Sequence, residues 1–154
     1  AIISIPAIKA VEFGLGFEAA ELFGSKVHDQ IAPGGENDKI RGGVRRKSNN
    51  AGGIEGGITN GEVLWLRAAM KPIPTLMSPL GTIDLLTGEP VLASKERSDT
   101  CAVSAASVVG EAMLALELAA HMAEKFGKDT VLEMKRNFDS YLGEMGKRWN
   151  KASS

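Results

Sequence analysis

The most unusual segment of the sequence reads Asn49-Asn50-Ala51-Gly52-Gly53-Ile54-Glu55-Gly56-Gly57-Ile58-Thr59-Asn60-Gly61. Glycines at this density indicate backbone with positive φ, or backbone that a ligand or another segment approaches closely. Their spacing matches neither the dinucleotide-binding fingerprint nor the P-loop. Two interpretations stay open. Backbone N–H groups close on a flat or anionic ligand, or two strands cross here at short range.

Strand-like segments lie on both sides of these glycines. Residues 8–13 alternate loosely between apolar and polar side chains, which predicts a strand. Residues 63–70 predict a second strand. The prolines within 71–75 end it, because proline cannot donate a hydrogen bond to a central ladder.

The connecting segments carry turn and helix signals. A short helix is expected at 17–23, stopped by Gly24. A hairpin is expected at 82–93, with Thr87-Gly88 as its turn. Residues 30–48 are polar and punctuated by glycines, and we expect a polar surface loop or a loosely held hairpin there.

The last third of the chain predicts two helices, over 105–126 and 130–145. Gly127 would cap the end of the first helix, and Thr130 with Glu133 forms a capping box for the second. Strands come first and helices last, without a regular alternation. This order predicts an α+β fold for residues 1–154, with no internal repeat.

Composition excludes several classes of protein. The chain has 154 residues, 44% of them hydrophobic and 24% charged, which is typical of a globular protein and not of a disordered tail. A net charge of −1 gives no general attraction to nucleic acid, although it does not exclude a local basic patch, and we expect no nucleic-acid partner. We see no apolar window long enough to cross a membrane. A single cysteine, Cys101, excludes an internal disulfide and favours a reduced, cytoplasmic compartment. Because the chain begins at Ala1 and not at methionine, we interpret it as a piece of a longer protein.

Two clusters of residue types could carry chemistry. Residues 71–75 join a lysine, a stiffened backbone and a hydroxyl, which suits a phosphate, although a solvated lysine at a strand end is the simpler interpretation. Arg97 and Asp99 precede the long helix. They would act as an anion clamp and a base, or as a plain ion pair and helix cap.

The remaining reactive side chains carry less information. His28 and His121 have no partner at metal-ligand spacing, so we expect no metal site. Cys101 has no second thiol, and we expect it to be a buried structural residue.

Four blocks of this sequence occur together, in this order, in one enzyme family. They are the residues 5–9, 11–14 and 16–17, the glycine-rich segment 49–61, Ala68-Ala69-Met70-Lys71-Pro72-Ile73-Pro74-Thr75, and Arg97-Ser98-Asp99-x-Cys101-Ala102-Val103. On these blocks the chain resembles the C-terminal portion of chorismate synthases. The resemblance implies a β-α-β sandwich of the chorismate synthase type, here only in its C-terminal portion. It also implies a homotetramer for the full-length family.

The resemblance further implies a lyase reaction that uses reduced FMN. Phosphate leaves 5-enolpyruvylshikimate 3-phosphate in a 1,4-anti elimination that yields chorismate. Asp99 would be the catalytic residue beside the reactive nitrogen of the flavin. The implied cofactor-binding residues are Ala7, Ile8, Gly56, Lys71, Pro72, Ile73, Pro74, Thr75 and Arg97.

Part of the machinery that the resemblance implies is missing. The family uses two histidines as acids and an arginine cluster that grips the substrate, and His28 and His121 do not match those histidines. We therefore expect this chain to be inactive by itself. The alternative is a structural or oligomerisation fragment with an incomplete flavin site.

Overall fold

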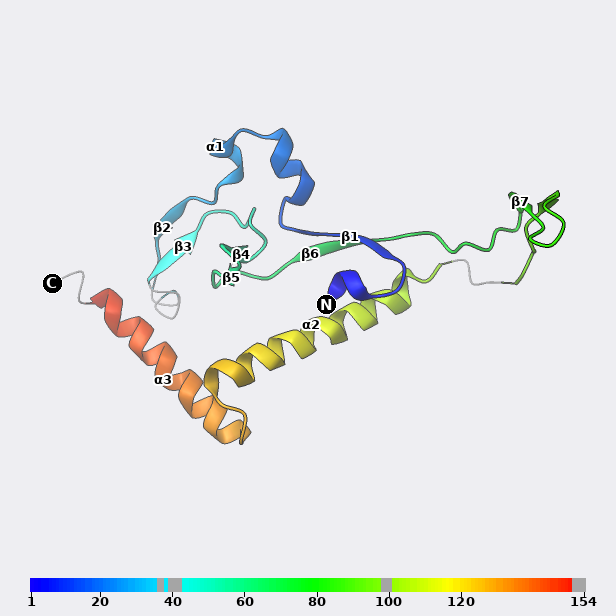
Figure 1. Cartoon of the computed structure of the whole chain (residues 1–154). Coiled ribbons are helices and arrows are strands. Elements are labelled where there is room, and N and C mark those ends of the chain that lie inside the picture. The colour runs from blue at the N-terminus through cyan, green and yellow to red at the C-terminus, as the bar shows by residue number, and fades with distance from the viewer. Residues whose placement is uncertain (36–37, 39–42, 98–100, 151–154) are drawn as a thin grey trace.

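The longest sheet pairs two strands that flank the glycine-rich segment in sequence. The computed structural model describes residues 1–35, 38, 43–97 and 101–150 (Figure 1). In it β1 (Ile8–Phe13) runs antiparallel to β6 (Leu66–Met70), with Phe13 opposite Leu66 and Ile8 opposite Met70. A bulge near Lys9 lets the six residues of β1 face the five of β6. Both expected strands are confirmed, although the second begins three residues later than 63.

Three further antiparallel pairs are short hairpins. They are β2 (Ile31–Pro33) with β3 (Val44–Arg46), β4 (Ile54–Glu55) with β5 (Ile58–Thr59), and β7 (Gly81–Ile83) with β8 (Pro90–Leu92). The last pair confirms the hairpin expected at 82–93. The carboxylate of Asp84 accepts hydrogen bonds from the backbone N–H groups of Leu86 and Thr87, and Gly88 takes a positive φ of 74°. These features fix the turn.

Of the two forms expected for the segment 30–48, the structure shows the hairpin and not the plain loop, because β2 and β3 pair within it and the Lys47 backbone N–H donates to the Gln30 carbonyl. One sequence expectation needs correction. The helix expected at 17–23 is a 3₁₀ helix, η2 (Gly16–Glu21), and Gly24 begins the one-turn helix α1 (Gly24–Val27) instead of ending one. The chain becomes extended at Leu22, which separates the two turns. A further 3₁₀ turn, η1 (Ile2–Ser4), opens the chain.

Two long helices complete the fold, as predicted. Helix α2 (Val103–Phe126) begins two residues earlier than expected, and α3 (Val131–Asn150) extends five residues beyond 145. Gly127 ends α2 with a φ of 99°, and the Thr130 hydroxyl accepts a hydrogen bond of 3.1 Å from the Glu133 backbone N–H. Contrary to our expectation, α2 is long and apolar enough to cross a membrane by length and composition alone. Core helices of soluble proteins meet the same criterion.

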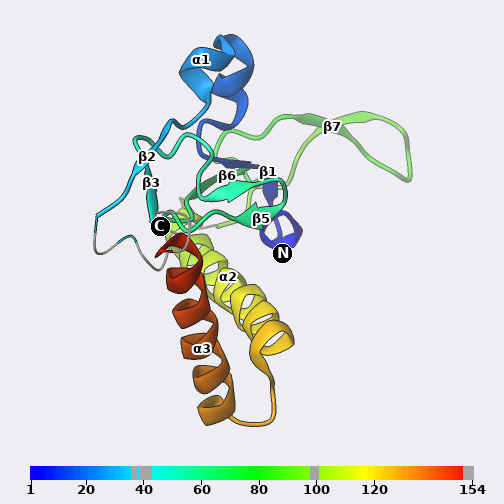
Figure 2. The ribbon, with the colours of Figure 1, turned by 90° about the vertical axis from the view of Figure 1, so that its left-hand side faces the viewer.

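Large apolar side chains pack closely in two places among the described residues. Phe126 packs edge-on against Phe138 at 5.3 Å and Tyr141 at 5.7 Å between ring centroids, where α3 turns back along α2 (Figure 2). Ile5 packs beside an apolar groove of about 330 Å³ between the β1–β6 sheet and the first half of α2. Among the described hydrophobic residues, only Phe126 and Ile5 are buried.

The molecule exposes far more surface than a self-contained domain of its mass. Its accessible surface is 11956 Å², whereas a folded monomer of 16.3 kDa exposes about 7,500 Å² by the usual scaling with mass. The β7–β8 hairpin projects away from the helices, and Leu85 and Leu86 at its tip are 91% and 96% exposed (Figure 1). The described residues therefore form a frame of α and β elements with most of their apolar faces uncovered.

Candidate functional site

The glycine-rich segment divides into two pairs of glycines with different roles. Gly52 and Gly53 both have positive φ, at 66° and 85°. A Cβ on Gly52 would lie 2.2 Å from the backbone nitrogen of Gly14, and a Cβ on Gly53 would lie 2.7 Å from the Val63 carbonyl oxygen. No side chain fits at those distances, so this pair forms a close crossing of two backbone segments, which agrees with one of our two interpretations except that the segments are turns and irregular backbone and not strands.

The second pair, Gly56 and Gly57, forms the turn of the β4–β5 hairpin. Both residues have positive φ, 59° and 79°, as a two-residue type I′ turn requires. Among the described residues, nothing lies within 4 Å of the positions that their Cβ atoms would take. The backbone of this turn is therefore open to a ligand, which is the feature that our other interpretation needs.

Another group of predicted site residues meets at the far end of the β1–β6 ladder. The Lys71 backbone N–H donates a 2.9 Å hydrogen bond to the Ala7 carbonyl, and Ile8 lies opposite Met70. Within the part of the chain that the structure describes, Ala7 is the one residue other than glycine that has a positive φ, at 69°. Such a conformation costs about 1–3 kcal/mol and persists only where the surroundings impose it. The contact of this backbone with the cofactor, which the resemblance implies, stays a prediction.

The two groups lie beyond opposite ends of β6. The β4–β5 hairpin lies beyond the start of that strand and Lys71 directly follows its end (Figure 1). A strand of five residues is about 17 Å long. The structure thus brings Ala7, Ile8 and Lys71 together but does not bring Gly56 to them. Pro72, Ile73, Pro74 and Thr75 continue away from the ladder without regular structure.

The remaining predicted residues are not joined to either group. Arg97 is exposed in the irregular segment before α2. Asp99, our predicted catalytic residue, lies outside the described residues. Cys101 is exposed and not buried as we expected, and it lies two residues before the start of α2. His28 is exposed, and His121 lies 3.6 Å from Glu124 on an exposed helix face. No cluster suited to a metal ion occurs within the described ranges.

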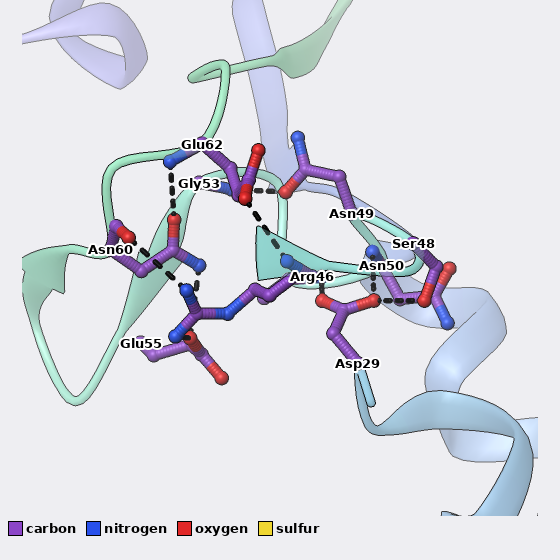
Figure 3. A network of polar contacts seen from close by, with 10 residues as sticks. Asp29, Arg46, Ser48, Asn49, Asn50, Gly53, Glu55, Asn60 and Glu62 are labelled. Carbon is purple, nitrogen blue, oxygen red and sulfur yellow. Dashed lines mark hydrogen bonds and ion pairs between the residues drawn. The ribbon is translucent and has the colours of Figure 1, made fainter. Parts of the chain in front are cut away.

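An aspartate that the sequence did not single out holds the entry to the glycine-rich segment. The Asp29 carboxylate accepts hydrogen bonds from the Ser48 hydroxyl and from the backbone N–H groups of Asn50 and Ala51, at 2.8 and 3.0 Å for the latter two (Figure 3). Burial raises the pKa of Asp29, but these hydrogen bonds and the charge of Arg46 outweigh it, so the pKa is lowered. Asp29 therefore stays ionised as an anchor for the loop.

An arginine anchors the other end of the glycine-rich segment. Arg46 ends β3, and its side chain is only 15% exposed. It forms an ion pair with Glu55 and donates a 3.1 Å hydrogen bond to the Asn60 carbonyl (Figure 3). Sequence reasoning missed both anchors because each lies in or beside the segment 30–48, whose polarity looked like that of an ordinary loop.

Comparison with solved structures identifies the architecture. The chain is similar to a structure described as "Crystal Structure of Chorismate Synthase", with a TM-score of 0.71 and 45% sequence identity. The match covers 95% of this chain and 34% of that one. The helices and short strands described above are thus part of the fold of that enzyme.

Comparison of sequences shows the family. A family model for chorismate synthase matches residues 1–123, and this chain belongs to the chorismate synthase family. The chorismate synthase of Geobacter sulfurreducens is 60% identical over 146 residues, and that of Aquifex aeolicus is 55% identical over 145 residues. These matches cover 92% and 94% of this chain but only 37% and 35% of the relatives, so the chain spans little more than a third of their length. Helix α3 lies outside the matched range of the family model.

Proposed function

We propose that this chain supplies the C-terminal part of a chorismate synthase, which forms chorismate from 5-enolpyruvylshikimate 3-phosphate. Family membership over residues 1–123 is the observation that carries the proposal. The reaction breaks a ring C–O bond to phosphate and a ring C–H bond, with no net redox change. Reduced FMN, when bound, supplies transient electron donation that helps to expel the phosphate. The complete protein would be a cytoplasmic homotetramer with a β-α-β sandwich fold.

The open backbone positions in the chain fit parts of a flavin site. The exposed Gly56-Gly57 turn offers N–H groups without side chains in front of them. Ala7 and Ile8 present a constrained backbone beside Lys71, whose ammonium suits a phosphate. Pro72 to Thr75 and Arg97 would extend this contact line along the cofactor.

Asp99 is the proposed proton-handling group. A carboxylate beside the reactive nitrogen of the flavin can accept or direct a proton there. Arg97 would hold positive charge close by, which suits an anionic part of the cofactor or substrate. Because the two residues are separated by one position, the same short segment would contribute both.

The separation of Gly56 from Lys71 along β6 supports an incomplete site in this chain alone. A ligand that contacts only the Gly56-Gly57 turn, or only the residues around Lys71, loses part of its contact surface. Binding must also order the uncovered loops, which costs free energy. We expect FMN to bind the isolated chain in the micromolar range or more weakly. We expect no chorismate formation by the chain with reduced FMN under anaerobic conditions.

The test compares the chain with a full-length chimaera. In the chimaera, the N-terminal part of the Geobacter sulfurreducens relative is joined to this chain. Flavin fluorescence titration should give tighter binding for the chimaera than for the chain, and only the chimaera should form chorismate. A soluble, folded chimaera without turnover would contradict the proposed function. Tight stoichiometric binding by the chain would contradict the incomplete site.

A second candidate function is that of a structural or oligomerisation fragment. The observation in its favour is the accessible surface of 11956 Å², well above that of a closed domain of this mass. It predicts that the isolated chain self-associates and shows no saturable FMN binding at any accessible concentration. The same titration, read together with sedimentation velocity, separates this function from the first.

A further inference from the structure

The β4–β5 hairpin is too short to hold its own position. Each strand contributes two residues, Ile54–Glu55 and Ile58–Thr59, and no third strand pairs with them among the described residues. Isolated two-stranded hairpins are marginally stable at best in water. The orientation of the exposed Gly56-Gly57 turn must therefore be set by contacts outside the ladder.

Arg46 makes those contacts from both sides of the hairpin. Its Nη2 pairs with the Glu55 carboxylate directly before the turn, and its Nη1 donates to the Asn60 carbonyl directly after β5. The Asn60 side-chain amide also donates to Glu55, at 2.9 Å. The backbone N–H of Arg46 donates to Glu62 at 3.4 Å. One guanidinium thus ties together the two ends of the hairpin (Figure 3).

The chemistry of this contact requires arginine. A planar guanidinium reaches two acceptors in fixed directions, whereas a lysine ammonium is a point charge on a flexible stem. The side chain is also largely buried, and its Nε has no hydrogen-bond partner within the described part of the chain. Retaining a buried donor without a partner costs free energy. The two Nη contacts to Glu55 and Asn60 offset that cost.

We propose that Arg46 is a positioning residue that fixes the Gly56-Gly57 turn for contact with the flavin. The inference rests on the proposed function for the identity of the ligand. A backbone donor contributes most to binding when its position is set before the ligand arrives. Arg46 contacts residues on both flanks of the turn, and no described atom outside the chain neighbours lies within 4 Å of the Cβ positions of Gly56 and Gly57, so the turn is both fixed and accessible.

The test uses Arg46→Met and Arg46→Lys in the chimaera, with Lys47→Met as the matched control. Lys47 carries the same charge at the next position, but its ammonium contacts the Gln30 side chain and not the hairpin. Arg46→Met should raise the Kd for FMN about tenfold or more, and Arg46→Lys about threefold to tenfold. Lys47→Met should leave the Kd unchanged. At saturating FMN, turnover should return to near that of the unmodified chimaera, which a general loss of structure would not allow.

Hydrogen exchange of the 54–60 amides tests the anchor without any flavin. Exchange there should accelerate in both Arg46 variants and not in the Lys47 variant. If exchange accelerates while the Kd for FMN stays unchanged, the positioning role is wrong. If Arg46→Met does not fold, Arg46→Lys provides the test, and an unchanged Kd for FMN in that variant overturns the positioning role. Absence of FMN binding by the unmodified chimaera would instead refute the proposed function, and the exchange data would still report on the anchor.

Discussion

The close crossing at Gly52 makes a sharp prediction about a single methyl group. In Gly52→Ala, the new Cβ would lie 2.2 Å from the Gly14 nitrogen and 2.8 Å from the Trp65 carbonyl oxygen. The backbone φ of 66° adds roughly 1–2 kcal/mol for a non-glycine residue. Overpacking against backbone adds about 1–3 kcal/mol. The expected local destabilisation is therefore about 2–5 kcal/mol.

Gly57→Ala is the matched control, since it shares the positive φ but not the contact. Gly57 has a φ of 79° with nothing described within 4 Å of its Cβ position, so only the backbone term of roughly 1–2 kcal/mol applies. The difference between the two variants isolates the steric cost of the crossing.

The assay is hydrogen exchange of two amides at the crossing. The Trp65 N–H donates to the Gly52 carbonyl at 3.2 Å, and the Gly14 N–H donates to the Trp65 carbonyl at 3.4 Å. In the chimaera, a loss of about 2 kcal/mol lowers protection of these amides about 30-fold. Gly57→Ala should leave them protected to within a few fold. Equal loss in the two variants would refute the argument that backbone contact, and not conformation alone, requires Gly52.

The remaining predictions concern one anchor and one catalytic group. Because the pKa of Asp29 is lowered from its ordinary value of 3.8, its contribution to stability is complete above that value and disappears as pH falls through the lower folded-state pKa. In acid unfolding of the chimaera, Asp29→Asn should therefore flatten the pH dependence below pH 3.8, and an unchanged profile would exclude the anchor. Asp99→Asn should lower chimaera turnover on the order of 10²-fold with FMN binding retained, if Asp99 handles a proton. Helix α2 has Ala102 at its N-cap and no side-chain cap hydrogen bond among the described residues, so the structure does not support the helix cap that the sequence also allowed for Asp99. If Asp99 has only a structural role, the nearly isosteric asparagine should leave steady-state turnover normal.

Local signals in the sequence predicted the elements that depend on neighbouring residues. The capping box of Thr130 and Glu133 uses residues three positions apart, and the turn at Thr87-Gly88 lies within one hairpin. The start of α2 was predicted to within two residues for the same reason, because helix-start signals are local. The five extra residues at the end of α3 were missed because no glycine or proline marks that end.

Contacts between distant segments were beyond such reasoning. The pairing of Gly52 with Gly14 joins positions 38 residues apart, and composition alone left strand crossing and ligand contact equally open. Asp29 accepts hydrogen bonds from Asn50 and Ala51, which lie 21 and 22 residues further along the chain. The predicted site residues came from a family resemblance, which supplies their identity but not the distance between Gly56 and Lys71.

The two-stranded sheets have a consequence for handling this chain in solution. In a two-stranded sheet each strand has one edge whose N–H and C=O groups lack a partner within that sheet. Such edges are templates for pairing with other molecules, and exposed leucines such as Leu85 and Leu86 in the loop between β7 and β8 add apolar surface beside them. We expect the isolated chain to aggregate in a concentration-dependent manner, with thioflavin-positive material at high concentration. Charged substitutions on the solvent-facing edge of β7 should keep the chain dispersed, because like charges on two such edges repel each other, and neither helix should change.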